Sequence, residues 1–335
     1  MEKKLPNPER IIGMTSAFFD SCVLFTASDL GVFAKLAELG SSEAGGLASA
    51  LGLDPRGTSL LLDACVALDL LRKEGNSYSN TPESGIFLVP GSPGDLSAAI
   101  RYNRDVYPAW GKLATFVKNG TPVEKPEFHL GEDPERTRTF VLSMHHRALA
   151  IGRSVLGELQ LDGRKTLLDI GGGPGTYSVL IAQAYPEMAC TVLDLPDVVK
   201  VAQELIHKQG YAERVKTLAG DYRTTPFPGG NDVINFFGMM HQESPQSIRS
   251  LLKKAYDALN PGGVVHVMDL MTDASHTKPK FSALFAVNMA LTTENGWVFA
   301  ETELIEWMQE AGFTDCQVKP LPPPMPHSFA FARKP

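Results

Sequence analysis

Cysteine and clustered positive charge are both scarce in this sequence. The four cysteines lie far apart, with no CxxC spacing and no neighbouring histidines, so they form no zinc-ligand pattern and favour reduced thiols. No block of Lys and Arg occurs and the formal charge is -7, which argues against a nucleic-acid or anionic-membrane partner. The expected partner is a small molecule or another protein. The cysteines are Cys22, Cys65, Cys190 and Cys316.

Long apolar runs are missing as well. No run of about 18 uncharged apolar residues stands out, and the charged first ten residues, broken by Pro6 and Pro8, lead into no signal-peptide core. We therefore expect a cytoplasmic protein without a membrane partner. The 335 residues suffice for two domains of roughly 150 residues each. With 43% hydrophobic and 21% charged residues, the chain is neither disordered nor fibrous.

The first third of the chain has helical periodicity. Apolar residues recur every three or four positions, which predicts helices, and Glu74-Gly75-Asn76 lies between short polar arms that are typical of a hairpin. We expect helices over 10–27, 29–39, 42–51 (with Ser41 and Ser42 as candidate N-caps) and 55–71, then a hairpin over 72–80. This order indicates a winged helix. Its last helix, LLLDACVALDLL over residues 60–71, is apolar nearly all round, so we expect it to be buried rather than laid on DNA.

The rest of the chain alternates between short apolar runs and helical patterns, which predicts a parallel sheet with helices on both faces. The fold class is α/β: a Rossmann-like, seven-stranded sheet that ends in an antiparallel hairpin, beside the mainly helical winged-helix domain. The expected strands are 166–170, 190–195, 215–219, 232–237, 264–270, 315–321 and 328–332. We expect a winged-helix domain over 1–105, linker helices over 106–160, among them a long helix over 133–159, and the α/β domain over 161–335.

A glycine-rich turn follows the first of these strands. Leu167 to Gly175 reads LLDIGGGPG, and glycines there let the backbone approach a ligand closely. The dinucleotide pattern GxGxxG fails, because its third glycine falls at Thr176. Asp194 ends the next strand, where a carboxylate can accept hydrogen bonds from ribose hydroxyls. Asp221-Tyr222 follows the third strand, in a position to meet an adenine. Read alone, the glycines fit an ordinary tight turn.

At these three places the sequence resembles the class I S-adenosylmethionine-dependent methyltransferases. The resemblance implies S-adenosyl-L-methionine as cofactor, with S-adenosyl-L-homocysteine as its product. An alternative role for the acid of the glycine turn is to shape its own loop. The cofactor-binding residues that the resemblance implies are Asp169, Gly171, Gly172, Gly173, Asp194, Leu195, Asp221, Tyr222 and Phe237.

The resemblance extends to one family. GVFAKLAE, LASALGLDP and LLLDACVALDLL in the first third are similar to the N-terminal domain of small-molecule O-methyltransferases, the group of the caffeic-acid and hydroxyindole enzymes. In that family the winged helix pairs two subunits. The resemblance therefore implies a homodimer and an aromatic small-molecule acceptor.

Methyl transfer to a hydroxyl needs a base, because a phenol of pKa about 10 is protonated at neutral pH. His241 follows an apolar strand, at the sheet edge where ligands of open α/β folds bind. Asp269 ends the next parallel strand and can orient the imidazole. We predict His241 as general base and Asp269 as its partner, as in the resembled family. The alternatives are a histidine packed before the next helix and a structural carboxylate.

The chain departs from the family near this histidine. The family has Asp-Trp where Gln242-Glu243 stands, and a basic or polar residue where Phe237 and Gly238 stand. Residues 296–300 read GWVFA instead of Gly-Arg-Glu-Arg-Thr, which removes a second acidic support. These changes leave open a C- or N-methyltransferase of a large aromatic or tetrapyrrole-like substrate, and a non-catalytic S-adenosylmethionine-binding protein.

The expected acceptor pocket is apolar and aromatic, which suits a flat aromatic molecule. Each of its residues also fits ordinary core packing, because helical spacing does not separate the two roles. No metal is implied. The pocket residues are Tyr107, Trp110, Met144, His145, Phe285, Asn288, Met289 and Trp297.

Overall fold

The computed structural model of the chain describes residues 7–92, 94–124, 133–323 and 325–335. The chain divides into two compact units, residues 1–105 and 106–335. Each unit has its own hydrophobic core.

The first unit is a winged helix, as predicted. Its helices α3, α4 and α5 pack around Phe33, Leu47 and Leu62, against a three-stranded sheet of order β1-β3-β2. Asp54 caps α5 by accepting a hydrogen bond from the Gly57 N–H. Its elements are α1 (Glu9–Ser16), α2 (Phe18–Asp29), α3 (Val32–Leu39), β1 (Ser42–Glu43), α4 (Ala44–Leu51), α5 (Pro55–Ala67), β2 (Leu71–Glu74), β3 (Ser77–Asn80) and α6 (Pro82–Phe87).

One expected helix start in this unit was wrong. Ser41 and Ser42 do not cap α4. Ser42 lies in β1, where it pairs with Tyr78 of β3, and the N-cap of α4 is Glu43. The expectation that no uncharged apolar run of about 18 residues occurs is not contradicted, but the segment Glu9–Asp29, formed by α1 and α2, is long and apolar enough to cross a membrane by length and composition. The expectation required an uncharged run, whereas a segment can keep a high average hydropathy around its few charged residues. Most of this segment is exposed in the single chain.

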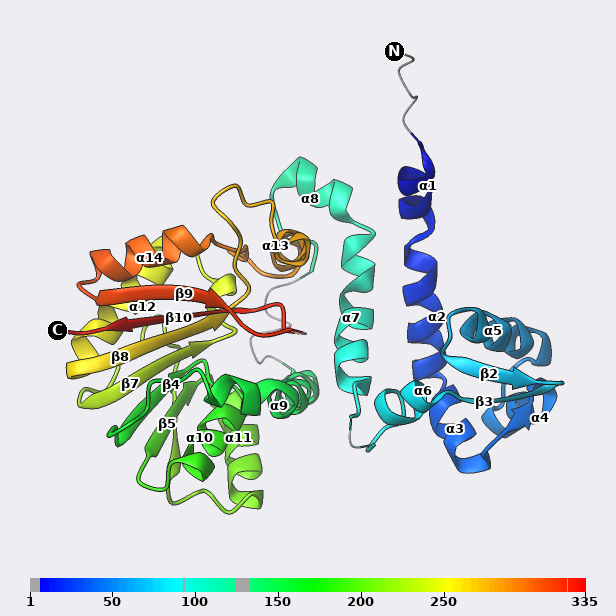
Figure 1. The fold of residues 1–335 in the computed structure, drawn as a ribbon, viewed down its shortest axis with the longest axis horizontal. Coiled ribbons are helices and arrows are strands. Elements are labelled where there is room, and N and C mark those ends of the chain that lie inside the picture. Colours follow the sequence, from blue (N-terminus) through cyan, green and yellow to red (C-terminus); the bar gives the residue numbers. More distant parts are fainter. Residues whose placement is uncertain (1–6, 93, 125–132, 324) are drawn as a thin grey trace, which may run out of the picture. The chain divides into compact units, whose positions relative to one another are not determined.

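The second unit holds a seven-stranded sheet of order β6-β5-β4-β7-β8-β10-β9 (Figure 1). The first five strands in this order, β6, β5, β4, β7 and β8, are parallel, and β10 runs antiparallel to both β8 and β9. This confirms the predicted sheet and its terminal hairpin. The strands are β4 (Thr166–Ile170), β5 (Ala189–Asp194), β6 (Val215–Ala219), β7 (Asn231–Phe237), β8 (Leu259–Asp269), β9 (Thr314–Pro320) and β10 (Ser328–Arg333).

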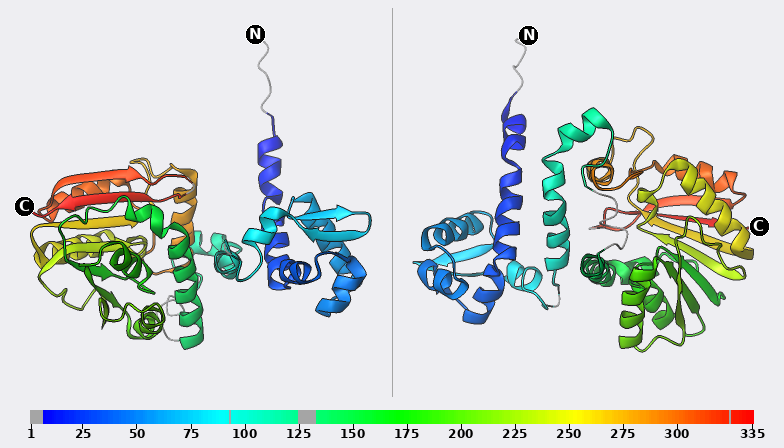
Figure 2. Two further views of the ribbon diagram at one scale, coloured as in Figure 1. Left: turned by 60° about the horizontal axis from the view of Figure 1, so that its bottom comes forward. Right: turned by 180° about the vertical axis from the view of Figure 1, so that it is seen from behind.

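Helices cover both faces of this sheet, as the two views of Figure 2 show. Leu252 of α12 and Trp307 of α14 belong to the core on one face. Val155 of α9, Val179 of α10 and Ile206 of α11 belong to the core on the other. The helices are α7 (Ser97–Trp110), which spans the division between the units, α8 (Leu113–Asn119), α9 (Pro134–Leu156), α10 (Thr176–Ala184), α11 (Pro196–Lys208), the 3-10 turn η2 (Met240–Gln242), α12 (Pro245–Ala258), α13 (Lys280–Thr292) and α14 (Glu301–Glu310).

The sheet order creates a place for a ligand. The chain moves outward from β4 to β5 and β6, then returns to place β7 on the other side of β4. Open parallel sheets bind ligands at such a reversal, beyond the carboxyl ends of the strands. The glycine loop follows β4 and His241 follows β7, so both lie at this edge.

Candidate active site

The loop after β4 is built from glycines that other residues could not replace without strain. Gly171, Gly173 and Gly175 have φ values of 63°, 53° and 70°, in the left-handed region that favours glycine. A Cβ on Gly172 would lie 2.7 Å from Cγ of Asp169. A Cβ on Gly173 would meet nothing within 4 Å. The loop therefore presents bare backbone to open space before the N-terminus of α10, an arrangement suited to close contact with a ligand.

Two buried carboxylates flank this loop. Asp194 accepts hydrogen bonds from the N–H groups of Gly173 (2.8 Å) and Leu195 (2.7 Å). Asp169 accepts one from the Ser178 hydroxyl at 2.7 Å. Burial raises the pKa of Asp194 to about 6 and that of Asp169 to about 7.

The remaining predicted cofactor residues lie at the ends of neighbouring strands. Asp221, two residues after β6, accepts a hydrogen bond from the Arg223 N–H at 2.8 Å. Phe237 ends β7, where its ring meets Tyr177 edge-on with centroids 5.2 Å apart. The predicted residues thus come from four adjacent strands and one edge of the sheet.

These groups fit the nucleoside and amino-acid parts of S-adenosylmethionine. Oδ1 of Asp169 is buried and accepts no hydrogen bond from any residue in the described part of the chain. Each oxygen of Asp194 accepts one hydrogen bond and has a further lone pair available. Buried oxygens with unused acceptor capacity, beside a backbone with open space around it, are suited to the hydroxyl and ammonium donors of such a molecule.

His241 and Asp269 form a close pair at the same edge. Nδ1 of His241 lies 2.6 Å from Oδ1 of Asp269, and the His241 backbone N–H donates to Oδ2 at 3.2 Å. The Asp269 side chain is 1% exposed and that of His241 is 12% exposed. The carboxylate therefore fixes the proton on Nδ1, which leaves the lone pair of Nε2 available. No residue among those described hydrogen-bonds to Nε2.

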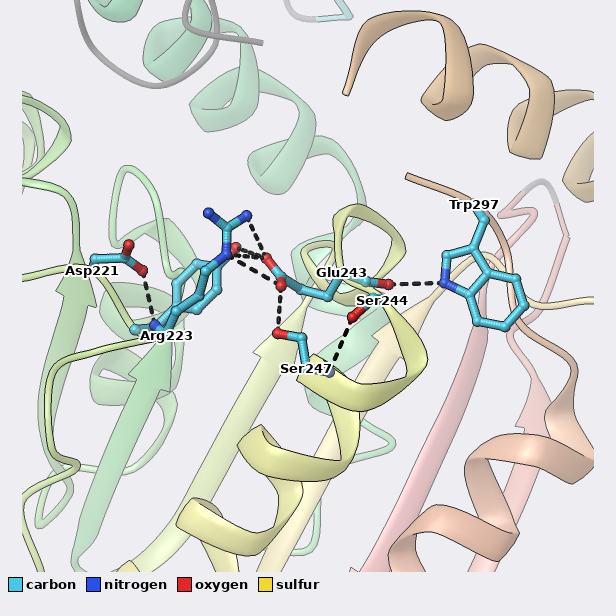
Figure 3. A network of polar contacts seen from close by, with 7 residues as sticks. Asp221, Arg223, Glu243, Ser244, Ser247 and Trp297 are labelled. Atoms are coloured by element: carbon cyan, nitrogen blue, oxygen red, sulfur yellow. Dashed lines mark hydrogen bonds and ion pairs between the residues drawn. The ribbon is translucent and has the colours of Figure 1, made fainter. Parts of the chain in front are cut away.

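A buried carboxylate lies two residues after His241 (Figure 3). Glu243 accepts hydrogen bonds from the Tyr222 hydroxyl at 2.8 Å, the Arg223 Nε at 2.9 Å and the Ser247 hydroxyl at 2.5 Å. Its side chain is 2% exposed. Tyr222 and Arg223 lie in the loop after β6, next to Asp221, the acid predicted to lie beside the adenine. Glu243 therefore links this loop to the loop after β7 that carries His241, called the histidine loop below. Burial, followed by the Glu243 charge, raises the pKa of Tyr222.

Trp297 contacts the histidine loop on the side of Glu243 that lies away from Arg223 (Figure 3). Its indole N–H donates to the Glu243 carbonyl at 2.8 Å, and its backbone N–H donates to the His241 carbonyl at 2.9 Å. This tryptophan lies in the segment where the sequence lacks the second acidic support of the resembled family. Two hydrogen bonds from Trp297 to main-chain carbonyls stabilise the loop where that acidic support is missing.

The structure brings together some of the predicted acceptor residues. Phe285 of α13 meets the His241 ring edge-on, with centroids 5.2 Å apart. The Trp110 indole donates to the Asn288 side-chain oxygen at 2.8 Å, so α7 and α13 are joined beside it. Met289 is buried next to Asn288, and Tyr107 is exposed.

Two predicted residues lie on α9. Nδ1 of His145 is 2.7 Å from the Thr176 hydroxyl at the start of α10, next to the glycine loop. Met144 precedes it and is half-buried. Sequence patterns alone do not place either residue in contact with an acceptor.

Sequence reasoning missed a second histidine close to the pair. The Arg147 guanidinium lies 2.7 Å from Nε2 of His327, which precedes β10 and is 6% exposed. It also missed the role of Glu243 and its donor Arg223. The long separation between partners hides these contacts from any local pattern. The one available signal was that Glu243 stands where the resembled family has tryptophan.

Comparison with known proteins identifies the family. Residues 111–314 match the O-methyltransferase domain and residues 12–90 match the O-methyltransferase dimerisation domain. The tetracenomycin polyketide synthesis 8-O-methyl transferase TcmO of Streptomyces glaucescens is 30% identical over 98% of this chain and 97% of its own length. Acetylserotonin O-methyltransferase of Macaca mulatta is 31% identical, over 91% and 92%.

A solved structure agrees with this. Human N-acetylserotonin methyltransferase in complex with SAM superposes with a TM-score of 0.87 at 29% identity, covering 100% of this chain and 99% of that one. The chain belongs to the O-methyltransferase family and is an S-adenosylmethionine-dependent methyltransferase.

Proposed function

We propose that this protein methylates a hydroxyl group of an aromatic small molecule, with His241 as general base and Asp269 as the residue that orients it. The observation that carries the proposal is the 2.6 Å contact between Nδ1 of His241 and Oδ1 of Asp269 at the ligand-binding edge of the sheet. The relatives named as O-methyltransferases support the choice of oxygen. No observation favours a carbon or nitrogen acceptor.

The cofactor-binding roles follow from the acceptor groups described above. Asp194 would accept hydrogen bonds from the ribose hydroxyls, and Asp221 and Tyr222 would flank the adenine. The backbone of Gly171 to Gly173, with Leu195 and Phe237 beside it, would enclose the rest of the molecule. Asp169 would face the amino-acid part with its unused oxygen. When bound, S-adenosylmethionine supplies an electrophilic methyl group and leaves as S-adenosylhomocysteine.

The protein's part in the reaction is to place the hydroxyl and remove its proton. Nε2 of His241 takes the hydroxyl proton as the oxygen forms its bond to the methyl carbon and the carbon–sulfur bond breaks. Asp269 stabilises the resulting imidazolium, which then releases the proton to solvent. The loop contacts made by Trp297 and Glu243 keep the imidazole in position. The aromatic acceptor would lie against Phe285, with the other predicted pocket residues around it.

We also propose that the protein is a cytoplasmic homodimer. The dimerisation domain covers residues 12–90, and Ile11, Met14 and Phe19 of α1 and α2 are 61%, 65% and 57% exposed in the single chain. Burial of these side chains against a second copy would account for the apolar surface without a membrane.

The test is His241→Ala with a panel of phenols and naphthols. We expect turnover to fall by about 10² to 10⁴, while S-adenosylhomocysteine still binds by calorimetry. His207→Ala, an exposed histidine on α11, is the matched control and should leave turnover unchanged. Product mass and fragmentation identify the methylated atom. Unchanged turnover in His241→Ala contradicts the base assignment, and sustained S-adenosylhomocysteine release excludes a non-catalytic protein.

A further inference from the structure

His327 lies next to the proposed base pair without belonging to it. It ends the connection between β9 and β10, and the next residue, Ser328, pairs with Asp269 across the sheet. Asp269 and His241 are near enough to influence the pKa of the His327 ring. His327 therefore lies beside the carboxyl end of β8, next to the residue that pairs with Asp269.

The protonation state of this ring is fixed by Arg147. A guanidinium has only donors, so the 2.7 Å contact with Nε2 requires that Nε2 accepts the hydrogen bond. The proton of the neutral ring is therefore on Nδ1. Burial, with the Arg147 charge, lowers the pKa of His327 to about 4, which keeps the ring neutral at neutral pH.

The Nδ1–H group of His327 is buried and unused. It has no hydrogen-bond partner within the part of the chain that the structure describes. An unsatisfied buried donor costs about 1–3 kcal/mol, and native proteins keep few of them. A donor held in a fixed tautomer by an arginine, beside the reacting residues, is suited to an oxygen supplied by a ligand.

We propose that His327 selects acceptors in which a carbonyl oxygen neighbours the methylated hydroxyl. This rests on the proposed function, because it assumes that the acceptor meets His241. Nδ1–H donates to the carbonyl oxygen. When the hydroxyl loses its proton to His241, part of the negative charge spreads through the ring onto that oxygen, so the hydrogen bond strengthens as the reaction proceeds. A phenol without the carbonyl leaves the donor buried and unpaired.

The experiment compares two ligands that differ only in the carbonyl, ortho-hydroxyacetophenone and ortho-ethylphenol. Their affinities are measured by ligand-observed NMR titration of the full chain saturated with S-adenosylhomocysteine. We expect the ketone to bind about tenfold more tightly, the value of one hydrogen bond to a buried donor. In His327→Leu this preference should fall below about twofold.

His327→Asn is the matched variant, because Asn and Leu have nearly the same shape and Asn keeps an N–H donor. We expect it to retain most of the ketone preference, which separates the loss of the donor from a change in packing. Unfolding midpoints and S-adenosylhomocysteine affinity check that both variants are folded. Equal preference in wild type and His327→Leu, or no binding of either ligand, overturns the proposal.

Turnover of His241→Ala, taken together with the titrations of wild type and His327→Leu, separates this inference from the proposed function. If turnover does not depend on His241 but the ketone preference still requires His327, the carbonyl site stands and the base assignment fails. If His241→Ala abolishes turnover and the preference is absent, the base stands and the carbonyl site fails.

Discussion

Replacement of Asp269 with asparagine keeps the size of the side chain and removes its charge. The carboxylate receives three hydrogen bonds, from the His241 backbone N–H at 3.2 Å, the His241 Nδ1 at 2.6 Å and the Leu270 N–H at 2.8 Å. An amide offers one acceptor oxygen and one donor nitrogen in place of the two carboxylate oxygens. In either orientation its NH₂ group faces a backbone N–H, which costs about 1–3 kcal/mol.

Both orientations impair the base. If the amide oxygen takes the Oδ1 position, His241 keeps its tautomer, but the imidazolium that forms in the reaction loses its counter-charge. If the nitrogen takes that position, it donates to Nδ1, and the proton of the ring moves to Nε2, which faces the acceptor. We expect Asp269→Asn to lower kcat/KM by about 10² to 10⁴.

The assay is initial rates of S-adenosylhomocysteine formation with a phenol that the wild type methylates. Calorimetric binding of S-adenosylhomocysteine serves as the control, because Asp269 does not belong to the proposed cofactor site and affinity should change less than about threefold. Turnover within about fivefold of wild type would refute the reasoning. Alignment of the hydroxyl with the methyl group would then account for the rate without proton removal.

Three further outcomes follow from the same contacts. Because burial raises the pKa of Asp194 to about 6 and that of Asp169 to about 7, and the donors of S-adenosylmethionine bind the ionised carboxylates, calorimetric affinity should fall as the pH drops below about 7 and more steeply below about 6, by up to about tenfold per pH unit for each group. Asp194→Asn should bind weakly and lose the steeper fall. Glu243→Gln places its one NH₂ group toward side chains that already donate, either Tyr222 and Arg223 or Ser247 and Arg223, so the free energy of unfolding in urea should fall by about 1–3 kcal/mol with a loss of turnover, and full stability would contradict the network. Gly172→Ala puts a Cβ 2.7 Å from Cγ of the buried Asp169 and should destabilise by about 1–3 kcal/mol in the same measurement, whereas Gly45→Ala, with open space around it, should not.

The elements that the sequence predicts well are those whose pattern is local. β4 and β6 match the predicted strands residue for residue. β4 is buried along most of its length, and such a strand of a parallel sheet is a short apolar run with clear ends. The pairing of His241 with Asp269 was also predictable from the sequence. Both residues follow adjacent parallel strands, whose carboxyl ends meet at one edge.

The contacts that were not predicted join segments with no shared pattern. Arg147 and His327 are 180 positions apart, and Trp110 and Asn288 are 178 apart. No periodicity in either partner signals the other, since the fold alone brings them together. The sequence suggested Trp297 as an acceptor residue from its aromatic character, whereas its two N–H groups also anchor the histidine loop, a role that depends on where main-chain carbonyls lie.

The position of β10 between β8 and β9 has a consequence for synthesis on the ribosome. Among the strands of the described residues, β9 pairs only with β10, so a nascent chain that has emerged only through β9 carries one strand without a partner and an open edge on β8. Ser328, beside Asp269, is among the last residues to join the sheet. The proposed catalytic pair therefore gains its final neighbour after every other strand has been made. A stalled or prematurely ended chain would hold the cofactor residues but expose an aggregation-prone edge, a state that chaperones must protect until β10 inserts.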